Sequence, residues 1–452
     1  MADKYVRSTD GSDADDGSTW ALAEATGAGA AAADSAGDRI FFADGHSEAA
    51  GANIAWAWAG TLAAPTMVLA VVDTGDPEPP TAIAAARVPI HTTGNNSIVI
   101  SGYVYTRKFD FQTSTTPASN NTARIDLGNA ASKQTYVDCN FYVNSTNAGV
   151  SVNVGGANST VNTSIEVECI DCDFRLGAAG QSVTFAGVCR VSGGGFASGG
   201  TSPTTAFSLT GGEGSIVLIE DFDLSVLDAG VDLFVGGAAA QLVSRAVIRN
   251  SDLPASWSGT LLSTAFTSPN RVEMHNCDAG DVNYALWVED QSGSTRHETT
   301  IIRTGARTDG TTNVSWKVVA NANAEFPLVP HVCPEIRVWS ETVGSVTIKI
   351  PFVHDDATDA KTNEIGMDIH YAGTSGSPLY LLATTDENPL GSFANHADAT
   401  SDDNWGTTGF TNENEQRMSL TFTTAEKGWI IIIPKVYEAS KTVYIDPDPQ
   451  IS

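Results

Sequence analysis

Short segments of alternating apolar and polar residues, each ending at an Asp or Asn, recur through the first two thirds of the chain. Five of them share the order Asp/Asn, a small or apolar residue, Asp/Asn, then an apolar residue. Their starts are 33, 50, 29 and 26 residues apart. Strand-sized alternation at this spacing is typical of a β-solenoid. The five segments are 138–141 (DCNF), 171–174 (DCDF), 221–224 (DFDL), 250–253 (NSDL) and 276–279 (NCDA).

Weaker coils extend this pattern. Residues 189–196 (CRVSGGGF) lie inside the 50-residue interval, and residues 97–104 and 299–305 have the same character before and after the marked repeats. Strands with one buried face are expected just before each Asp or Asn. We place them at 165–169, 215–219, 246–248 and 271–274. The pattern therefore predicts a right-handed parallel β-helix over residues 85–306.

The same alternation predicts which side chains fill the interior of the coils. The Asp or Asn falls at a sharp bend between two strands, and such a bend commonly needs a left-handed backbone conformation that Asn and Asp tolerate. Around residue 171 the expected inward side chains are Val167, Cys169, Cys172 and Phe174, and the expected outward ones are Glu166, Glu168 and Asp173.

Most of the cysteines fit this repeat. Cys139, Cys172 and Cys277 hold the same repeat position, so we expect one inward file that also contains Phe222 and Ser251. A Cys169-x-x-Cys172 spacing can indicate zinc or redox chemistry, but a second such pair and a nearby His pair are missing from the sequence. Packing inside the coils is the favoured interpretation, and no disulfides are expected in a chain made in a cytoplasm.

The two ends differ from the repeat. Residues 19–35 are Ala-rich with a helical pattern and precede a strand at 37–43, which suggests a helical cap and first coils over residues 1–84. From 307 to 452 the strands are longer and no helix is expected, which favours an antiparallel β-sandwich. Its strands are expected at 315–320, 335–340, 345–353, 364–371, 417–422, 429–436 and 442–445.

Both ends carry a resemblance. Residues 5–20 (YVRSTDGSDADDGSTW), the Ala-rich segment and the following Gly37-Asp38-Arg39-Ile40 resemble the opening of right-handed β-helix proteins of the pectate-lyase-like superfamily. Phage and marine-virus virion proteins are prominent among these. Residues 408–412, 421–423, 426–428 and 442–447 resemble a C-terminal module of phage β-helix proteins. The resemblance implies a fold and a virion setting, but no particular activity.

Charge narrows the classes of partner. The chain has 53 Asp and Glu against 24 Lys and Arg, a net charge of −29, so phosphate contacts with nucleic acid would be repulsive. No apolar run approaches the ~20 residues of a membrane helix, and no membrane partner is expected. The N-terminus lacks a basic region followed by an apolar core, so we expect no signal peptide and synthesis in the cytoplasm of a bacterial host.

Candidate chemistry is sparse. Enzymes of this fold act mainly on polysaccharides and need paired carboxylates. Glu220, Asp221 and Asp223 are the best local cluster, and they are weak catalytic candidates because each also fits an outward or turn position of the repeat. No phosphate loop and no Ser/His/Asp order stands out. These features lean against an enzyme; if the chain is one, a polysaccharide hydrolase or lyase is expected.

Two further features leave alternatives open. The acidic loop of Asp10, Asp13, Asp15 and Asp16 could hold Ca²⁺, but it lacks the spacing and the Glu of an EF-hand, so a solvated loop is favoured. No other cofactor is expected. Exposed tryptophans can stack on sugar rings or on a partner protein, and buried ones pack inside the fold. A buried pair is favoured for Trp56 and Trp58, and Trp339, Trp405 and Trp429 have the same two interpretations.

Three functions from different classes remain. The first is a non-catalytic structural protein of a bacteriophage virion, an exterior decoration, cement or fibre protein on the capsid. The second is a tailspike or receptor-binding protein that recognises or degrades host surface polysaccharide. A cellular carbohydrate-active enzyme is the least favoured, because the export signal is missing. The resemblance implies other virion proteins as partners and a homo-oligomer of the trimeric kind.

Overall fold

The computed structural model divides the chain into two compact units, which are described separately. The first comprises Met1–Glu273 with two short later segments, and the second comprises mainly Val282–Asp290 and Thr295–Ser452. The division therefore falls nearer residue 282 than the expected 306. The described residues are 2–114, 121–128, 132–155, 165–210, 215–236, 243–263, 270–280, 282–292, 295–306, 314–320, 331–332, 336–354, 365–374, 380–384, 396–397, 416–436, 442–445 and 450–451.

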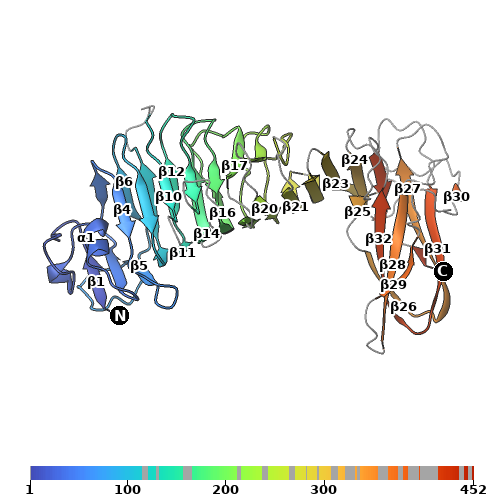
Figure 1. Ribbon diagram of the computed structural model, residues 1–452, viewed down its shortest axis with the longest axis horizontal. Helices are drawn as coiled ribbons and strands as arrows, with labels where there is room; N and C mark the ends of the chain where they lie inside the picture. Colours follow the sequence, from blue (N-terminus) through green and yellow to red (C-terminus); the bar gives the residue numbers. More distant parts are fainter. Residues whose placement is uncertain are drawn as a thin grey trace. The chain divides into compact units, whose positions relative to one another are not determined.

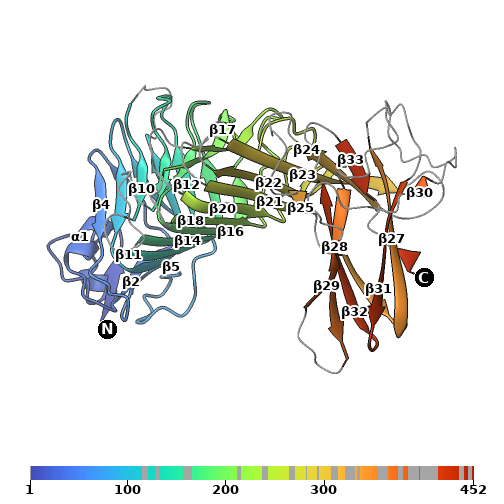
Figure 2. The same cartoon turned by 45° about the vertical axis from the view of Figure 1, so that its right-hand side comes forward.

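The first unit is a parallel β-helix, as the repeat predicts. Successive coils stack so that each strand pairs in parallel with the strand of the next coil (Figure 1). The first face contains β1 (Asp3–Val6), β2 (Arg39–Ala43), β5 (Thr66–Val71), β8 (Val104–Arg107), β11 (Ser132–Val137), β14 (Ile165–Arg175), β16 (Val188–Phe196), β18 (Ser215–Glu220) and β20 (Val243–Arg249). Figure 2 shows β14, β16, β18 and β20 side by side.

Two more faces complete each coil. On the second face β3 (Glu48–Ala50) pairs in parallel with β6 (Val88–Thr92), which pairs with β9 (Phe109–Thr113), and β12 (Asn140–Val143) joins β9 to the end of β14. The third face is a seven-stranded sheet. Its strands are β4 (Ile54–Ala57), β7 (Ile98–Ser101), β10 (Ile125–Leu127), β13 (Val152–Val154), β15 (Val183–Phe185), β17 (Thr205–Leu209) and β19 (Asp232–Gly236).

The recurring Asp or Asn is the corner between the first and second faces. All five residues have a positive φ, between 49° and 53°. In coils without the motif, Lys108 (φ 70°) and Gly193 (φ 69°) hold the same place. The left-handed conformation predicted for the bend is therefore confirmed. These five residues are Asp138, Asp171, Asp221, Asn250 and Asn276.

The interior agrees with the expected alternation. Cys139, Cys172 and Cys277 are fully buried, and Phe222 and Ser251 are 1% exposed. The five cysteines that the structure describes are free thiols. Burial raises the pKa of Cys139 and Cys172 well above the ordinary value, so the thiols stay protonated and pack as small apolar side chains.

The N-terminal helical prediction is largely wrong. Instead of one helix over 19–35, there is a single 3₁₀ turn, Trp20–Leu22, and a six-residue helix α1, Gly27–Ala32. Between them, Glu24 N–H donates to the Tyr5 carbonyl, so this part of the chain pairs with β1. The carboxylate of Asp13 also accepts from the N–H groups of Ala25 and Thr26. Tertiary hydrogen bonds thus outweigh the helix propensity of alanine.

The second unit contains all seven predicted strands in antiparallel pairing, together with additional ones. The predicted coil at 299–305 is wrong, because β23 (Thr295–Ala306) pairs antiparallel with β24 (Val314–Ala320). One sheet centres on β27 (Gly344–His354), β31 (Gln416–Thr424) and β33 (Thr442–Ile445). The other holds β26 (Ile336–Ser340), β28 (Ile365–Gly373) and β32 (Gly428–Val436). Figure 2 shows several of these strands, and their closure into a sandwich stays a prediction.

Candidate functional site

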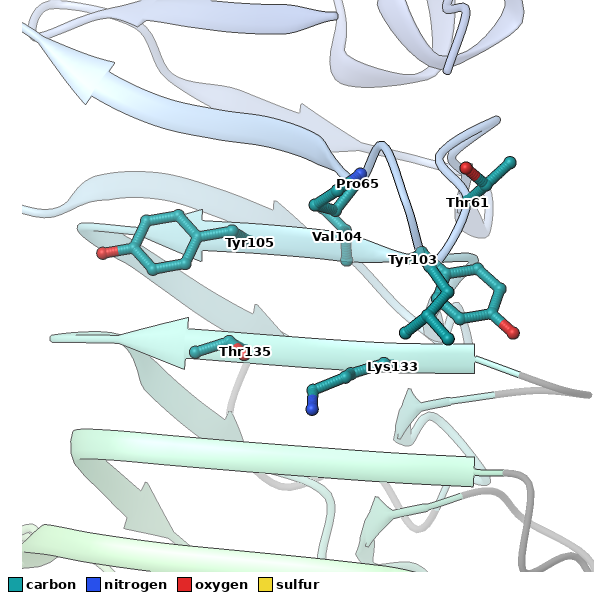
Figure 3. A pocket seen from close by; sticks show the side chains of 8 residues that line it. Thr61, Pro65, Tyr103, Val104, Tyr105, Lys133 and Thr135 are labelled. Carbon is teal, nitrogen blue, oxygen red and sulfur yellow. The ribbon is translucent and has the colours of Figure 1, made fainter. Parts of the chain in front are cut away.

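A groove on the outer surface of the β-helix combines aromatic, apolar and cationic side chains. Alternation on β8 buries Val104 and Thr106 and turns Tyr105 outward, and Tyr103 lies directly before the strand. In the next coil Thr135 pairs with Tyr105. The cavity has a volume of about 290 Å³ (Figure 3). Its lining residues are Thr61, Leu62, Pro65, Tyr103, Val104, Tyr105, Lys133 and Thr135.

The loop before β5 forms one wall of the groove. Thr61 and Ala64 exchange backbone hydrogen bonds of 3.0 and 3.1 Å, which closes a tight turn with Leu62 at its tip. Gly60 lets this loop approach Tyr103, because a β-carbon there would lie 2.1 Å from the Tyr103 carbonyl oxygen. Leu62 is 70% exposed, so a large apolar side chain faces solvent beside the two tyrosines.

The groove chemistry suits a sugar ring. Aromatic and aliphatic side chains offer apolar faces, whereas tyrosine and threonine hydroxyls and the Lys133 ammonium can hydrogen-bond to sugar hydroxyls. Lys133 also pairs with Glu166 in the next coil at 3.0 Å. The hydrogen bond and the charge of Glu166 raise the pKa of Lys133, so the ammonium keeps its charge at the rim of the groove.

A charged cluster lies at the corner that follows these strands. Arg87 contacts Asp138 at 2.9 Å and Asp173 at 3.2 Å, and Lys108 contacts Asp138 at 2.6 Å. Burial acts to raise the pKa of Asp138, but Lys108 and Arg87 outweigh it and hold that pKa below its ordinary value. Burial raises the pKa of Asp173, and Arg87 offsets this only in part. Arg87 therefore links two later coils and forms ion pairs with both the Asp138 and the Asp173 carboxylates.

The three predicted catalytic candidates follow one another around a different corner. Glu220 is 6% exposed, and its carboxylate pairs with Arg190 at 3.0 Å and with Arg249. Asp221 is the corner residue, with φ 51°. Asp223 is exposed and accepts a hydrogen bond from Ser225 N–H at 2.8 Å. The Glu220 and Asp223 carboxylates thus make separate structural contacts, and Asp221 shapes the backbone of the corner.

Substitution of Asp221 separates a corner role from a catalytic one. Asp221→Val is expected to lower the free energy of unfolding by about 1–2 kcal/mol, because a β-branched residue is strained at a positive φ. Asp221→Gly is expected to be nearly neutral, because glycine adopts this conformation readily. Thermal unfolding of the two variants checks this, and equal losses for both would contradict the corner role.

The aspartates of the acidic loop each bond to the protein. Asp10 pairs with Arg7 at 2.6 Å, and Asp13 accepts from Thr26 Oγ1 at 2.8 Å as well as from two backbone N–H groups. Asp16 accepts from Ser18 N–H at 3.0 Å, and Asp15 N–H donates to the Ser12 carbonyl. Among the residues that the structure describes, no three His, Cys, Asp or Glu side chains gather in a metal-binding arrangement.

The tryptophans divide into two kinds. Trp56 and Trp58 are buried, at 0% and 4% exposure, as favoured from the sequence. Trp339 and Trp429 are exposed, and Trp405 lies outside the described residues.

In the described part of the chain no helix is long and apolar enough to span a bilayer.

The residues that line the groove were not predicted as a site from the sequence. The available signal was the alternation of Tyr103 and Tyr105 around buried Val104, at the end of a segment already recognised as a coil. Arg87 gave no such signal, because it lies outside the repeat.

The fold and the groove define a parallel β-helix protein with an outer surface groove. No protein-family model matches the chain, and no curated protein matches it. Among solved structures it is similar to the enzymatically active domain of tailspike protein 4 of bacteriophage CBA120, with 9% identity and a TM-score of 0.27. This match covers 92% of the present chain and 64% of that one, so the present chain spans less than two thirds of its length.

A second similar structure is a tailspike protein of the Acinetobacter baumannii bacteriophage Fri1, a capsular polysaccharide depolymerase. The identity is 10% and the TM-score is 0.24, and the match covers 90% of this chain and 81% of that one.

Proposed function

We propose that this chain is a tailspike-type component of a bacteriophage virion, and that its β-helix binds host surface polysaccharide in the groove of Tyr103 and Tyr105. The groove carries the proposal, because it places two aromatic rings, an exposed Leu62 and the Lys133 ammonium around one cavity of about 290 Å³. A cavity that combines apolar faces with a few polar groups is typical of a small-molecule or sugar site. The role on the virion and the trimeric assembly belong to the same proposal.

The proposal concerns binding rather than cleavage. Glu166, beside the groove, pairs with Lys133 at 3.0 Å. At the corner that follows, Asp138 and Asp173 both contact Arg87. A glycosidase pair must instead protonate a leaving group and activate a nucleophile. We therefore favour this function over the capsid decoration role expected from the sequence, because glycan binding needs such a groove and capsid decoration does not.

Tyr105→Ala is expected to weaken polysaccharide binding by about tenfold or more, since truncating an aromatic anchor commonly costs over 1.4 kcal/mol. The measurement is biolayer interferometry against a panel of purified bacterial capsular and surface polysaccharides. Tyr142→Ala is the matched control, because Tyr142 is outward-facing on β12 but lies outside the groove.

Two results would contradict the proposal. One is binding that Tyr105→Ala leaves unchanged, or no binding to any polysaccharide of the panel. The other is gold-labelled antibody that marks only the capsid shell of intact particles, since a tailspike lies at the tail.

A further inference from the structure

We propose that Trp339 and Trp429 form a second carbohydrate site, in the C-terminal unit, which takes a neutral hexose. The two residues are direct neighbours across the antiparallel pair β26 and β32. They are 39% and 48% exposed, and their ring centroids are 5.5 Å apart at an interplanar angle of 74°. The site lies outside the β-helix, so it does not depend on the groove.

The strands turn these indoles outward while burying other residues. On β32, Ile430 and Ile432 are fully buried and Trp429 is not. On β26, Ile336 and Ser340 are buried and Trp339 is not. Large side chains that face solvent together are informative, because a fold normally buries such surface unless something else covers it.

Polar groups at the rim hold the Trp339 indole in place. Trp339 Nε1 donates to Glu341 Oε1 at 2.7 Å, and the same carboxylate pairs with Lys427. The hydrogen bonds from Lys427 and Trp339 lower the pKa of Glu341, which stays ionised. The two indole rings are nearly perpendicular to each other. A sugar can therefore stack its C–H face on one indole and contact the other with its edge. Its hydroxyls then reach Glu341 and Lys427.

The charge and the exposed area of the tryptophan pair favour a neutral sugar over a polyanionic glycan or a second copy of the chain. The chain carries a net charge of −29, and the rim holds one carboxylate and one ammonium, so a polyanionic glycan gains nothing there. A second copy of the chain needs about 800 Å² on each partner for a stable interface. Two half-exposed indoles offer only about 200 Å² if a whole side chain buries 150–250 Å².

The test is calorimetric titration of the full-length chain with maltotetraose and chitotetraose as neutral probes and tetragalacturonate as the anionic probe. We expect at least one neutral probe to bind, with a loss of about tenfold or more in Trp339→Ala and in Trp429→Ala. Trp429→Phe is expected to keep part of the affinity, because it retains an aromatic face. Tyr142→Ala, a change on β12 outside both the groove and the tryptophan pair, is expected to leave this binding unchanged.

Three results would overturn the inference. Neither neutral probe binds, or both tryptophan variants bind as the wild type does, or tetragalacturonate binds more tightly than the neutral probes. Light scattering of the same variants provides a further check, since dissociation of an oligomer would identify the pair as a subunit contact.

Discussion

Gly194→Ala is expected to lower the free energy of unfolding of the β-helix unit by about 3 kcal/mol, from left-handed backbone strain and a forced backbone shift. Gly194 has φ 75°, and a β-carbon there would lie 2.0 Å from the Cys172 carbonyl oxygen of the preceding coil. That oxygen belongs to a stacked strand and cannot move without breaking the parallel pairing. The measurement is guanidinium unfolding followed by circular dichroism.

Gly199→Ala is the matched control for this effect. Gly199 also has a positive φ, 82°, but a β-carbon there meets nothing within 4 Å. Gly199→Ala should therefore lower the free energy of unfolding only by the cost of left-handed backbone strain, about 1 kcal/mol. Equal losses in the two variants would show that the close approach to Cys172 contributes nothing to stability.

Gly194 also illustrates what the sequence could predict. It pairs with Cys172 in the inward file, and residues 189–196 were recognised as a coil although the Asp/Asn motif is missing there. The repeat predicts corners, inner files and strand order because each coil stacks only on its neighbours, so local alternation decides the packing. The prediction of an N-terminal helix was wrong because hydrogen bonds accepted by the Asp13 carboxylate and the Tyr5 carbonyl decide that segment, and local alternation does not contain them.

The functional surfaces were harder to predict for the same reason. The groove joins the loop at Leu62 to Tyr105 and Lys133, which belong to successive coils, and only the register of the coils brings them together. Trp339 and Trp429 are 90 residues apart in the sequence and become neighbours through antiparallel pairing. The run after Trp429 is uniformly apolar, so alternation could not decide that this tryptophan faces solvent.

The second large effect is expected from Phe141→Ala, which should cost about 3–5 kcal/mol of unfolding free energy. Phe141 is fully buried in an aromatic stack, with ring centroids 5.7 Å from Phe111 and 5.6 Å from Phe174. Tyr136 packs edge-on against it at 5.3 Å. Truncation leaves a cavity that stacked coils cannot close, because their backbones are fixed by parallel pairing.

Phe141→Leu is the graded control and should lose clearly less, since most of the volume remains. Guanidinium unfolding of the three proteins checks the order. Polysaccharide binding by Phe141→Ala, measured well below its unfolding midpoint, should equal that of the wild type, because the Tyr105 groove lies on the outer surface of the coils. A folded Phe141→Ala protein that had lost this binding would show that the groove depends on the aromatic stack inside the coils.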